Sequence, residues 1–253
     1  MVRILDYLLA NLPSGWQTGF LYLGVNWTLM VVQHGAGQRR AGLAATPAAE
    51  RVAMQAQFQV GPQPMAGVDA ATLALSAQAA DPVEAAVGLA TLNALLQPEP
   101  GLLADIDAAD WLVAHGRERQ VALVGRFPFI DELKPVVARL WVLELSPQLG
   151  EYGADQAARI IPQADVVAIT SSSLINHTLD GLLALARPEA KVLLLGPSTP
   201  LTPLLFDFGV DLLAGVQVVD MEAVLAAVAS PANFQKMTGV RRVSMQNLRK
   251  EAK

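Results

Sequence analysis

The chain of 253 residues contains no cysteine. This absence excludes disulfides, cysteine-ligated zinc, iron–sulfur clusters and a thiol nucleophile. Only three histidines occur, and no two of them have the spacing with which histidines on one helix face bind a metal. A G-x-S-x-G motif, the mark of many serine hydrolases, is also absent. We therefore expect no preformed protein metal site, and the sequence alone names no cofactor.

Charged side chains are scarce as well, at 16% of the residues, whereas hydrophobic residues make up 53%. This balance supplies a core and excludes intrinsic disorder. The formal net charge is -5, and a nucleic-acid partner would need a basic face, so we expect none. The basic cluster near the C-terminus, Arg241, Arg242 and Arg249 with two lysines, is interpreted as part of a solvated helix.

Long apolar runs are missing too, since none reaches the roughly 18 residues that span a bilayer. The first residues carry Asp6 within their apolar stretch and show no cleavage pattern of a signal peptide. We therefore expect a cytoplasmic protein with no membrane partner. The sequence leaves open whether the chain forms a homo-oligomer.

The first hundred residues indicate a mixed α and β region. Apolar residues recur at helical spacing from Ile4 to Leu12, which predicts a helix. Branched and aromatic residues predict strands over 19–32 and 41–45, joined by a Gly-rich hairpin turn. Residues 47–68 lack a clear period and are interpreted as a loop.

Two helices should follow this loop, and the second of them has a clear start at Asp81. Asp81 is a preferred N-cap, Pro82 suits the first helical position, and Glu84 completes the pattern. The helix should run to about Leu96, where Gln97-Pro98-Glu99-Pro100-Gly101 breaks the chain. We predict a domain boundary there, with a first domain of residues 1–100 and a second of 101–253.

From Asp105 onward, short apolar runs alternate with amphipathic segments. Apolar runs between helices are typical of parallel strands that helices cover on both faces. We therefore predict an α/β fold, a Rossmann-like doubly wound sheet of about five parallel strands, preceded by a smaller α+β domain. The runs are 121–124, 140–145, 165–169, 191–195 and 211–214, and the helices are expected at 131–138, 155–162, 174–186, 202–208 and 221–229.

The residues that follow these runs are the candidate site. All parallel strands end at one edge of the sheet, and ligands bind at that edge. Loops rich in glycine, proline and hydroxyl residues follow four of the runs. We predict that residues of these loops line one ligand-binding cleft, to which the first domain contributes Asn93. They are Gly125, Arg126, Phe127, Pro128, Thr170, Ser171, Ser172, Asn176, Gly196, Pro197 and Ser198.

Glu144 ends the second run, about 20 residues after Gly125, where Rossmann domains place an acid on ribose hydroxyls. The first loop lacks G-x-G-x-x-G, and Arg126 and Phe127 stand where a pyrophosphate would need bare backbone. A standard dinucleotide site is therefore not expected. The other interpretation of Glu144 is that it pairs with Arg126 or caps a loop.

Two further positions allow alternatives. The run Thr170–Ser173 lies where a strand passes into a predicted helix, whose first N–H groups would favour an anion. Alternatively, Ser172 or Ser173 only caps that helix. Asn93 lies within an apolar helix, and its amide needs partners, so it either caps a neighbouring backbone or faces the cleft.

Several segments resemble one family in order along the chain. They are Gly125 to Ile130, Asp165 to Asp180, Leu195 to Pro200 and Gly209 to Val216. The family is labelled "putative heavy-metal chelation", and the first half of the chain looks like the domain that commonly precedes it. The resemblance implies an enolase-N-terminal-like first domain, a Rossmann-like second domain and a cleft between them. It implies no established reaction.

These inferences converge on a ligand-binding protein. We expect a small polar ligand, a metal chelate or its organic precursor, to bind between the two domains. The alternative is a transferase-type enzyme that binds a nucleotide-like cofactor, such as S-adenosylmethionine, at the strand ends through Glu144.

Overall fold

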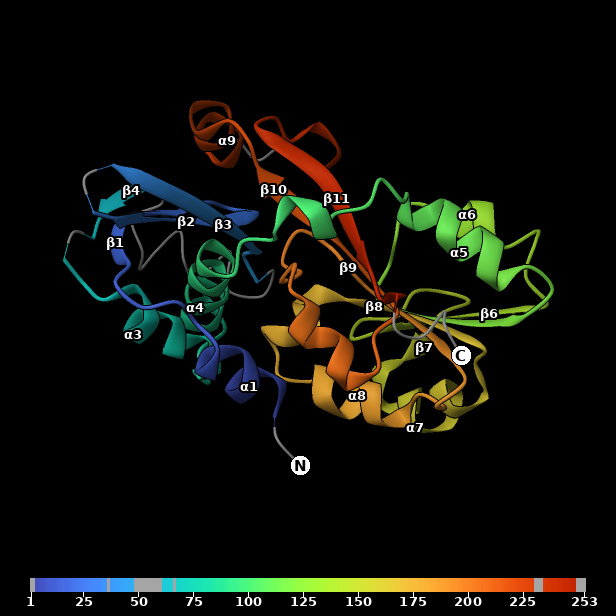
Figure 1. The fold of residues 1–253 in the computed structure, drawn as a ribbon. Helices are drawn as coiled ribbons and strands as arrows, with labels where there is room; N and C mark the ends of the chain where they lie inside the picture. The colour runs from blue at the N-terminus through green and yellow to red at the C-terminus, as the bar shows by residue number, and fades with distance from the viewer. Residues whose placement is uncertain (1–2, 36, 48–60, 66, 230–233, 249–253) are drawn as a thin grey trace.

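The computed structural model describes residues 3–35, 37–47, 61–65, 67–229 and 234–248. Two sheets organise them (Figure 1), an antiparallel sheet of four strands from the first part of the chain and a seven-stranded sheet from the second. The predicted α/β class, with a largely parallel Rossmann-like sheet, is confirmed.

The antiparallel sheet is covered on both faces. Along its strand β2, alternate side chains face opposite ways, as the period of a strand requires. Met30 and Val32 pack with the helices of the same region, whereas Leu29 and Val31 pack against the distant helix α9. The strand order is β3-β2-β1-β4, with β1 (Gln17–Leu23), β2 (Trp27–His34), β3 (Gln38–Ala45) and β4 (Gly61–Pro64).

The helix α4 (Pro82–Leu95) lies against this sheet and is buried nearly all round. Its predicted start is confirmed, because the Asp81 carboxylate accepts hydrogen bonds from the N–H groups of Val83 and Glu84. Around it lie α1 (Ile4–Ala10), α3 (Ala70–Ala74) and the 3₁₀ helix η1 (Leu75–Gln78).

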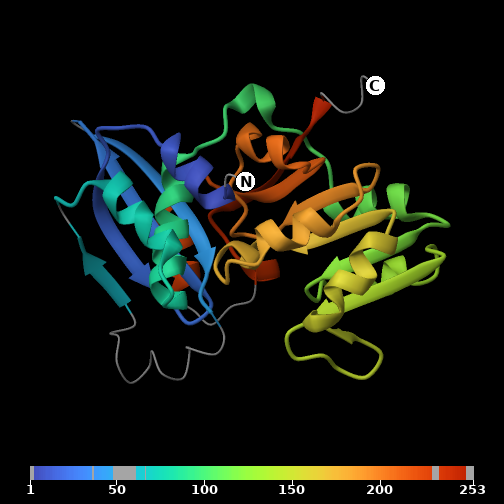
Figure 2. The same ribbon diagram turned by 90° about the horizontal axis from the view of Figure 1, so that it is seen from below.

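The larger sheet has the order β11-β10-β9-β8-β5-β6-β7, and all its pairs are parallel except β10 with β11. Figures 1 and 2 show α5 and α6 on one face and α7 and α8 on the other. Its strands are β5 (Gln120–Val124), β6 (Arg139–Glu144), β7 (Tyr152–Gly153), β8 (Val166–Thr170), β9 (Lys191–Leu195), β10 (Leu212–Val218) and β11 (Val240–Gln246).

The helices of this part are short. The α-helices are α5 (Ala108–Gly116), α6 (Ile130–Leu133), α7 (Ala157–Ile160), α8 (Leu179–Leu185) and α9 (Met221–Val228). The 3₁₀ helices are η2 (Pro100–Leu102), η3 (Ala154–Gln156), η4 (Ile161–Gln163), η5 (Ser171–Leu174), η6 (Pro203–Phe208) and η7 (Phe234–Lys236).

Two aspartates join neighbouring strands at the amino ends of this sheet. Asp165 Oδ2 accepts from the Gln120 N–H at 2.9 Å, and its Oδ1 pairs with Arg187 at 2.8 Å. Asp211, which is buried, accepts from the Val192 N–H at 2.8 Å. The hydrogen bonds from Gln120 and then from Arg187 lower the pKa of Asp165. These two carboxylates therefore stabilise the pairing of neighbouring strands.

Some predictions about secondary structure were wrong. Within 47–68, residues 61–64 form β4, an edge strand antiparallel to β1, and prolines are tolerated at such an edge. Arg241 and Arg242 lie in β11 and not in a helix, because Val240–Gln246 pairs along the whole of β10. Residues 48–60 and Arg249 lie outside the described part.

The predicted helices 131–138, 155–162, 174–186 and 202–208 are also shorter or of the tighter 3₁₀ type. In the third of these, His177 has a φ of 57°, which no α-helix tolerates, so α8 begins only at Leu179.

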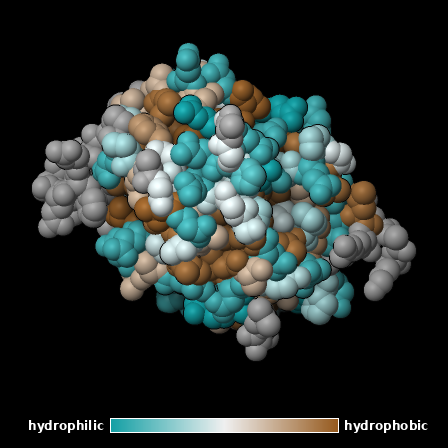
Figure 3. All heavy atoms as spheres, turned by 60° about the vertical axis from the view of Figure 1, so that its left-hand side comes forward, coloured by the Kyte–Doolittle hydropathy of each residue, from teal (hydrophilic) through white to brown (hydrophobic). Residues whose placement is uncertain are grey.

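The predicted domain boundary at residue 100 falls between α4 and α5, in the segment of η2, and the division into domains stays a prediction. Among the described helices, none is long and apolar enough to cross a membrane. Hydrophilic and hydrophobic residues lie side by side on the face that Figure 3 shows.

Candidate ligand-binding site

A cavity of about 450 Å³ lies at the carboxyl ends of the parallel strands. The loops after β5, β8 and β9 line it, together with β10, β11 and the first residues of α5. The antiparallel sheet contributes Trp27 and Ala45, so the cavity lies between the two parts of the molecule. Of the predicted site residues, it is lined by Arg126, Phe127, Pro128, Thr170, Ser171, Ser172, Gly196 and Pro197.

Two glycines shape the strand ends. Gly125 has a φ of 110° and Gly196 a φ of 130°, a region of backbone conformation that other residues rarely adopt. A Cβ atom at 196 would lie 2.6 Å from Ser171 Oγ, and one at 125 would lie 3.1 Å from the Thr170 side chain. Glycine at both positions therefore lets the loops after β5 and β9 close around Thr170 and Ser171.

The segment Thr170–Ser173 is held by its own hydrogen bonds. Thr170 is the cap, since its hydroxyl accepts from the Ser172 N–H, and the Ser173 hydroxyl donates to the Thr170 carbonyl. The prediction that Ser172 or Ser173 is the cap is therefore wrong. The helix that Thr170 caps is η5, a 3₁₀ helix of four residues, so the dipole of a long helix does not support an anion here. The half-buried Ser172 side chain lines the cavity, and its hydroxyl forms no such hydrogen bond with the described residues.

Arg126 makes an ion pair, but not with Glu144. Its Nε and Nη2 donate to the two carboxylate oxygens of Glu151 at 2.8 and 2.6 Å. The hydrogen bonds from Arg126 and from the Gln148 N–H lower the pKa of Glu151 to about 2. The bond to Glu151 raises the pKa of Arg126, and Glu144 adds only a weaker, purely coulombic effect. The predicted alternative, a pair between Glu144 and Arg126, is corrected accordingly.

The remaining predicted residues lie outside the lining of the large cavity. Glu144 ends β6, one strand beyond β5. Asn176 is exposed, and its amide oxygen accepts from the Thr178 N–H and hydroxyl, which turns the chain after η5. Ser198 is buried, and its hydroxyl accepts from the Ala45 N–H at 2.8 Å.

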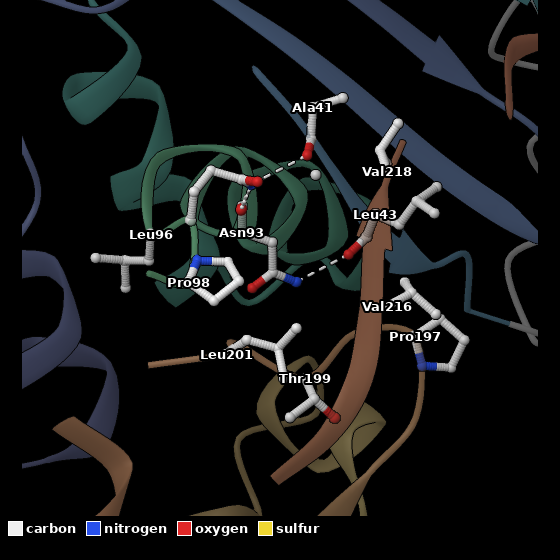
Figure 4. Close-up of a pocket in the computed structure, with 12 residues that line it drawn as sticks. Ala41, Leu43, Asn93, Leu96, Pro98, Pro197, Thr199, Leu201, Val216 and Val218 are labelled. Carbon is white, nitrogen blue, oxygen red and sulfur yellow. Dashed lines mark hydrogen bonds between the residues drawn. The ribbon is translucent and has the colours of Figure 1, made fainter. Parts of the chain in front are cut away.

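Asn93 also joins the two parts, from α4. Its amide nitrogen donates to the Leu43 carbonyl at 2.8 Å and to the Ser198 carbonyl at 3.0 Å. Asn93 and Pro197 line a separate small cavity beside the large one (Figure 4). Of the two interpretations of Asn93, the capping of neighbouring backbone is therefore confirmed, and its predicted place in the lining of the large cavity is corrected.

Several lining residues were not among the predicted ones. They are Asp105 to Ala109, which lead into α5, Ala214 and Gly215 of β10, and Arg242 of β11. The start of α5 could have been found, because Asp107 caps it through the N–H groups of Ala109 and Asp110. The position of β11 depends on tertiary pairing and has no local signal of this kind.

The donor atoms of the cavity do not fit a heavy-metal ion held by side chains. Its lining contains two carboxylates, Asp105 and Asp107, and no histidine. Within the described ranges, no three His, Cys, Asp or Glu residues form a group that could hold a metal. Metals of this kind prefer thiolate or imidazole ligands, and thiolate is absent from the chain.

The fold and this cavity define a two-part α/β protein with a Rossmann-like sheet. The chain belongs to the DUF364 family, described as "Putative heavy-metal chelation", whose model matches residues 107–246, more than half of its length. A second family model with the same description matches residues 7–96. The predicted resemblance is thus confirmed.

Three similar proteins have no stated function. An uncharacterised protein of Methanocaldococcus jannaschii is 32% identical over 152 residues, and the match covers 57% of this chain and 59% of that protein. A crystal structure of a DUF364 protein of unknown function from Desulfitobacterium hafniense matches with a TM-score of 0.80 and 26% identity, covering 96% of this chain and 98% of the other. Another, from Pyrococcus horikoshii, matches with a TM-score of 0.77, 20% identity and coverage of 96% and 100%, and shows the fold alone.

Proposed function

We propose that the protein binds a small polar ligand, a metal chelate or its organic precursor, in the cavity of about 450 Å³ between its two parts. The observation that carries the proposal is the convergence of the loops after β5, β8 and β9 around one cavity. Ligand sites of open parallel sheets lie at this edge, and pockets for small molecules have volumes of roughly 300–1,000 Å³.

The chemistry of the lining supports a polar ligand with an apolar portion. Phe127 and Phe129 stack in parallel with ring centroids 5.4 Å apart and belong to the wall with Trp27. Arg126, Arg242 and the hydroxyl of Ser172 add polar groups at separate points of the same wall. A few polar groups in a mainly apolar pocket orient a ligand, while the apolar surface supplies affinity.

Because the cavity lining fits a bare metal ion poorly, the form in which a metal would bind is restricted. With no thiolate and no histidine in the wall, a heavy metal would be carried in by ligand atoms that already surround it. The family description "Putative heavy-metal chelation" agrees with a metal chelate as cargo. Free Zn(II), Co(II) or Ni(II) should accordingly not bind in the submicromolar range, whereas suitable chelates of the same ions should. Equilibrium dialysis with each ion, alone and as its citrate or histidine chelate, checks this.

A matched pair of variants tests the site. Ser172→Phe would fill the cavity from a half-buried position, whereas Ser146→Phe makes the same change at an exposed loop after β6. Native mass spectrometry with elemental analysis should find a small molecule on the wild type and on Ser146→Phe, and little on Ser172→Phe. Equal occupancy of the two variants would contradict the proposal.

A further inference from the structure

Arg126, which lines the large cavity, uses only one edge of its guanidinium group within the protein. Nε and Nη2 donate side by side to the two carboxylate oxygens of Glu151. The planar guanidinium has further N–H groups, on Nη1 and on the other side of Nη2. These remaining N–H groups form no hydrogen bond within the part of the chain that the structure describes. The Nη1–Nη2 edge of Arg126 therefore has donors to offer to a ligand.

Glu151 holds the Arg126 guanidinium in a fixed orientation. The Glu151 side chain is only 12% exposed, and its carboxylate also accepts the Gln148 N–H at 2.7 Å. The hydrogen bonds from Arg126 and Gln148 lower the pKa of Glu151 to about 2, so the carboxylate stays charged at neutral pH. A guanidinium that is already oriented in this way loses little further freedom when it binds a ligand.

The shape of the unoccupied edge matches one class of ligand group. The two parallel N–H groups of a guanidinium edge fit two oxygen atoms of a carboxylate or a phosphate, and such bidentate pairs are among the stronger hydrogen-bonded contacts. Beside Arg126, the stacked rings of Phe127 and Phe129 belong to the same cavity wall. An oxyanion and an apolar group could therefore be bound next to each other.

We propose that Arg126 binds an oxyanion of the ligand, a carboxylate or a phosphate, through the Nη1–Nη2 edge that Glu151 leaves unoccupied. Phe127 and Phe129 would pack against an apolar, ring-like portion of the same ligand. This inference rests on the proposed function, because it assigns a chemical class to the ligand of the same cavity.

The acidic residues nearby do not prevent this contact. Glu144 acts on Arg126 only through a coulombic effect that is weaker than the bond from Glu151. Asp107 of the cavity wall is engaged by the N–H groups at the start of α5. The Arg126 side chain is 41% exposed, so water and salt screen charges that do not touch it, whereas a bidentate contact is direct.

Small aromatic probes test the assignment on the whole chain. Benzoate and phenyl phosphate carry the two kinds of oxyanion on a ring, whereas benzamide is neutral and has the shape of benzoate. In ligand-observed NMR titrations, the better of the two oxyanions should bind the wild type at least about tenfold more tightly than benzamide does. The order of benzoate and phenyl phosphate would identify the kind of oxyanion. Equal binding of benzamide, or no binding of either oxyanion, would overturn the proposal.

Variants locate the contact. Arg126→Gln should weaken binding of the oxyanion by about tenfold or more and leave benzamide binding unchanged. Arg126→Lys keeps the charge but loses the paired donors, so it should also weaken binding, and it serves as the test should Arg126→Gln fail to fold. The control Arg117→Gln removes the same charge at an exposed position before β5 and should bind the probes like the wild type.

Ser172→Phe, which would fill the cavity, separates this inference from the proposed function. If Ser172→Phe abolishes oxyanion binding and neither change at Arg126 alters it, the cavity binds the probe without Arg126, and only the present inference is overturned. If Ser172→Phe leaves oxyanion binding unchanged, the probe binds outside the cavity, and the proposed function is contradicted as well. Loss of binding in both Ser172→Phe and Arg126→Gln supports both proposals.

Discussion

The two ends of the seven-stranded sheet use polar residues differently. At the amino ends, Asp165 and Asp211 both accept N–H groups of a neighbouring strand, so their carboxylates are engaged within the sheet. At the carboxyl ends, the loops line a cavity, and Ser172 presents a hydroxyl to it. The first part of the chain covers this second end through Trp27, Ala45 and Asn93.

This difference teaches how to separate structural from candidate functional polar groups. An aspartate would be the more conspicuous residue in a search for a site, yet in this protein the aspartates at the strand ends hold the sheet together. Changes at the amino ends should therefore alter stability and leave ligand occupancy unchanged. Changes of cavity-lining side chains at the carboxyl ends, such as that of Ser172, should do the reverse.

Cutting the chain should have the largest effect, because it removes the cover of the carboxyl ends. We propose that the chain divides into domains 1–100 and 101–253. The fragment 101–253 alone should aggregate, because α9 would expose Val224 and Val228, which are buried against the antiparallel sheet. Fragments expressed together should reassociate, as size-exclusion chromatography and circular dichroism would show. A failure to associate would mean that the cut lies inside a folding unit.

Among single substitutions, Asp211→Ala should produce the largest effect. It leaves the buried N–H of Val192 without its acceptor and removes a partner of Lys191. We expect the free energy of unfolding to fall by about 3 kcal/mol, measured by urea denaturation. The control is Asp131→Ala, whose side chain is 90% exposed and whose pair with Lys134 should contribute less than about 1 kcal/mol. If Asp211→Ala altered ligand occupancy at a temperature where the variant stays folded, the amino ends of the strands could not be assigned a purely structural role.

Asp165 should make stability depend on pH. Its folded pKa is lowered, so its contribution is fully present above the unfolded value of about 3.9 and is lost as the pH falls through the folded pKa. Asp165→Asn should be less stable than the wild type by roughly 1 kcal/mol at neutral pH, a deficit that shrinks below about pH 4. Urea denaturation of both proteins from pH 2 to pH 7 measures it. A deficit that is constant with pH would refute the assignment.

Ser172→Ala should have the smallest effect on stability. The side chain has no internal partner to lose among the described residues, so the free energy of unfolding should change by less than about 0.5 kcal/mol. The occupancy of the co-purified ligand should nevertheless fall. The matched change Ser173→Ala, which removes a hydrogen bond to the Thr170 carbonyl, should instead lower stability. Equal effects of both changes on the free energy of unfolding would contradict the different roles assigned to Ser172 and Ser173.

Much of the fold could be predicted because its signals are local. Asp81, Pro82 and Glu84 form a local start signal of a helix, and the short apolar runs before Gly125, Thr170 and Gly196 are typical of buried parallel strands. The strands β7 and β11 could not be predicted in the same way. The first has two residues, and the second has two arginines where an apolar run would be expected.

The site residues likewise fall into those that could be predicted from the sequence and those that could not. The loops after β5, β8 and β9 follow from the topology of a parallel sheet, so residues such as Thr170 and Pro197 could be placed at one edge. Residues from other elements depend on tertiary packing. Arg242 reaches the cavity only because β11 returns beside β10, and Asn93 lies behind it because two carbonyls hold its amide there.

The position of α9 also bears on how the chain acquires its fold. Leu29 and Val31 of β2 are covered by a helix that begins only at Met221, so one face of the first sheet stays open to solvent until the ribosome has made most of the second. Contacts so distant in sequence form late and slow the folding reaction. During synthesis, this exposed face of the nascent sheet would be a target for chaperones, and a truncated chain lacking α9 would be prone to aggregate.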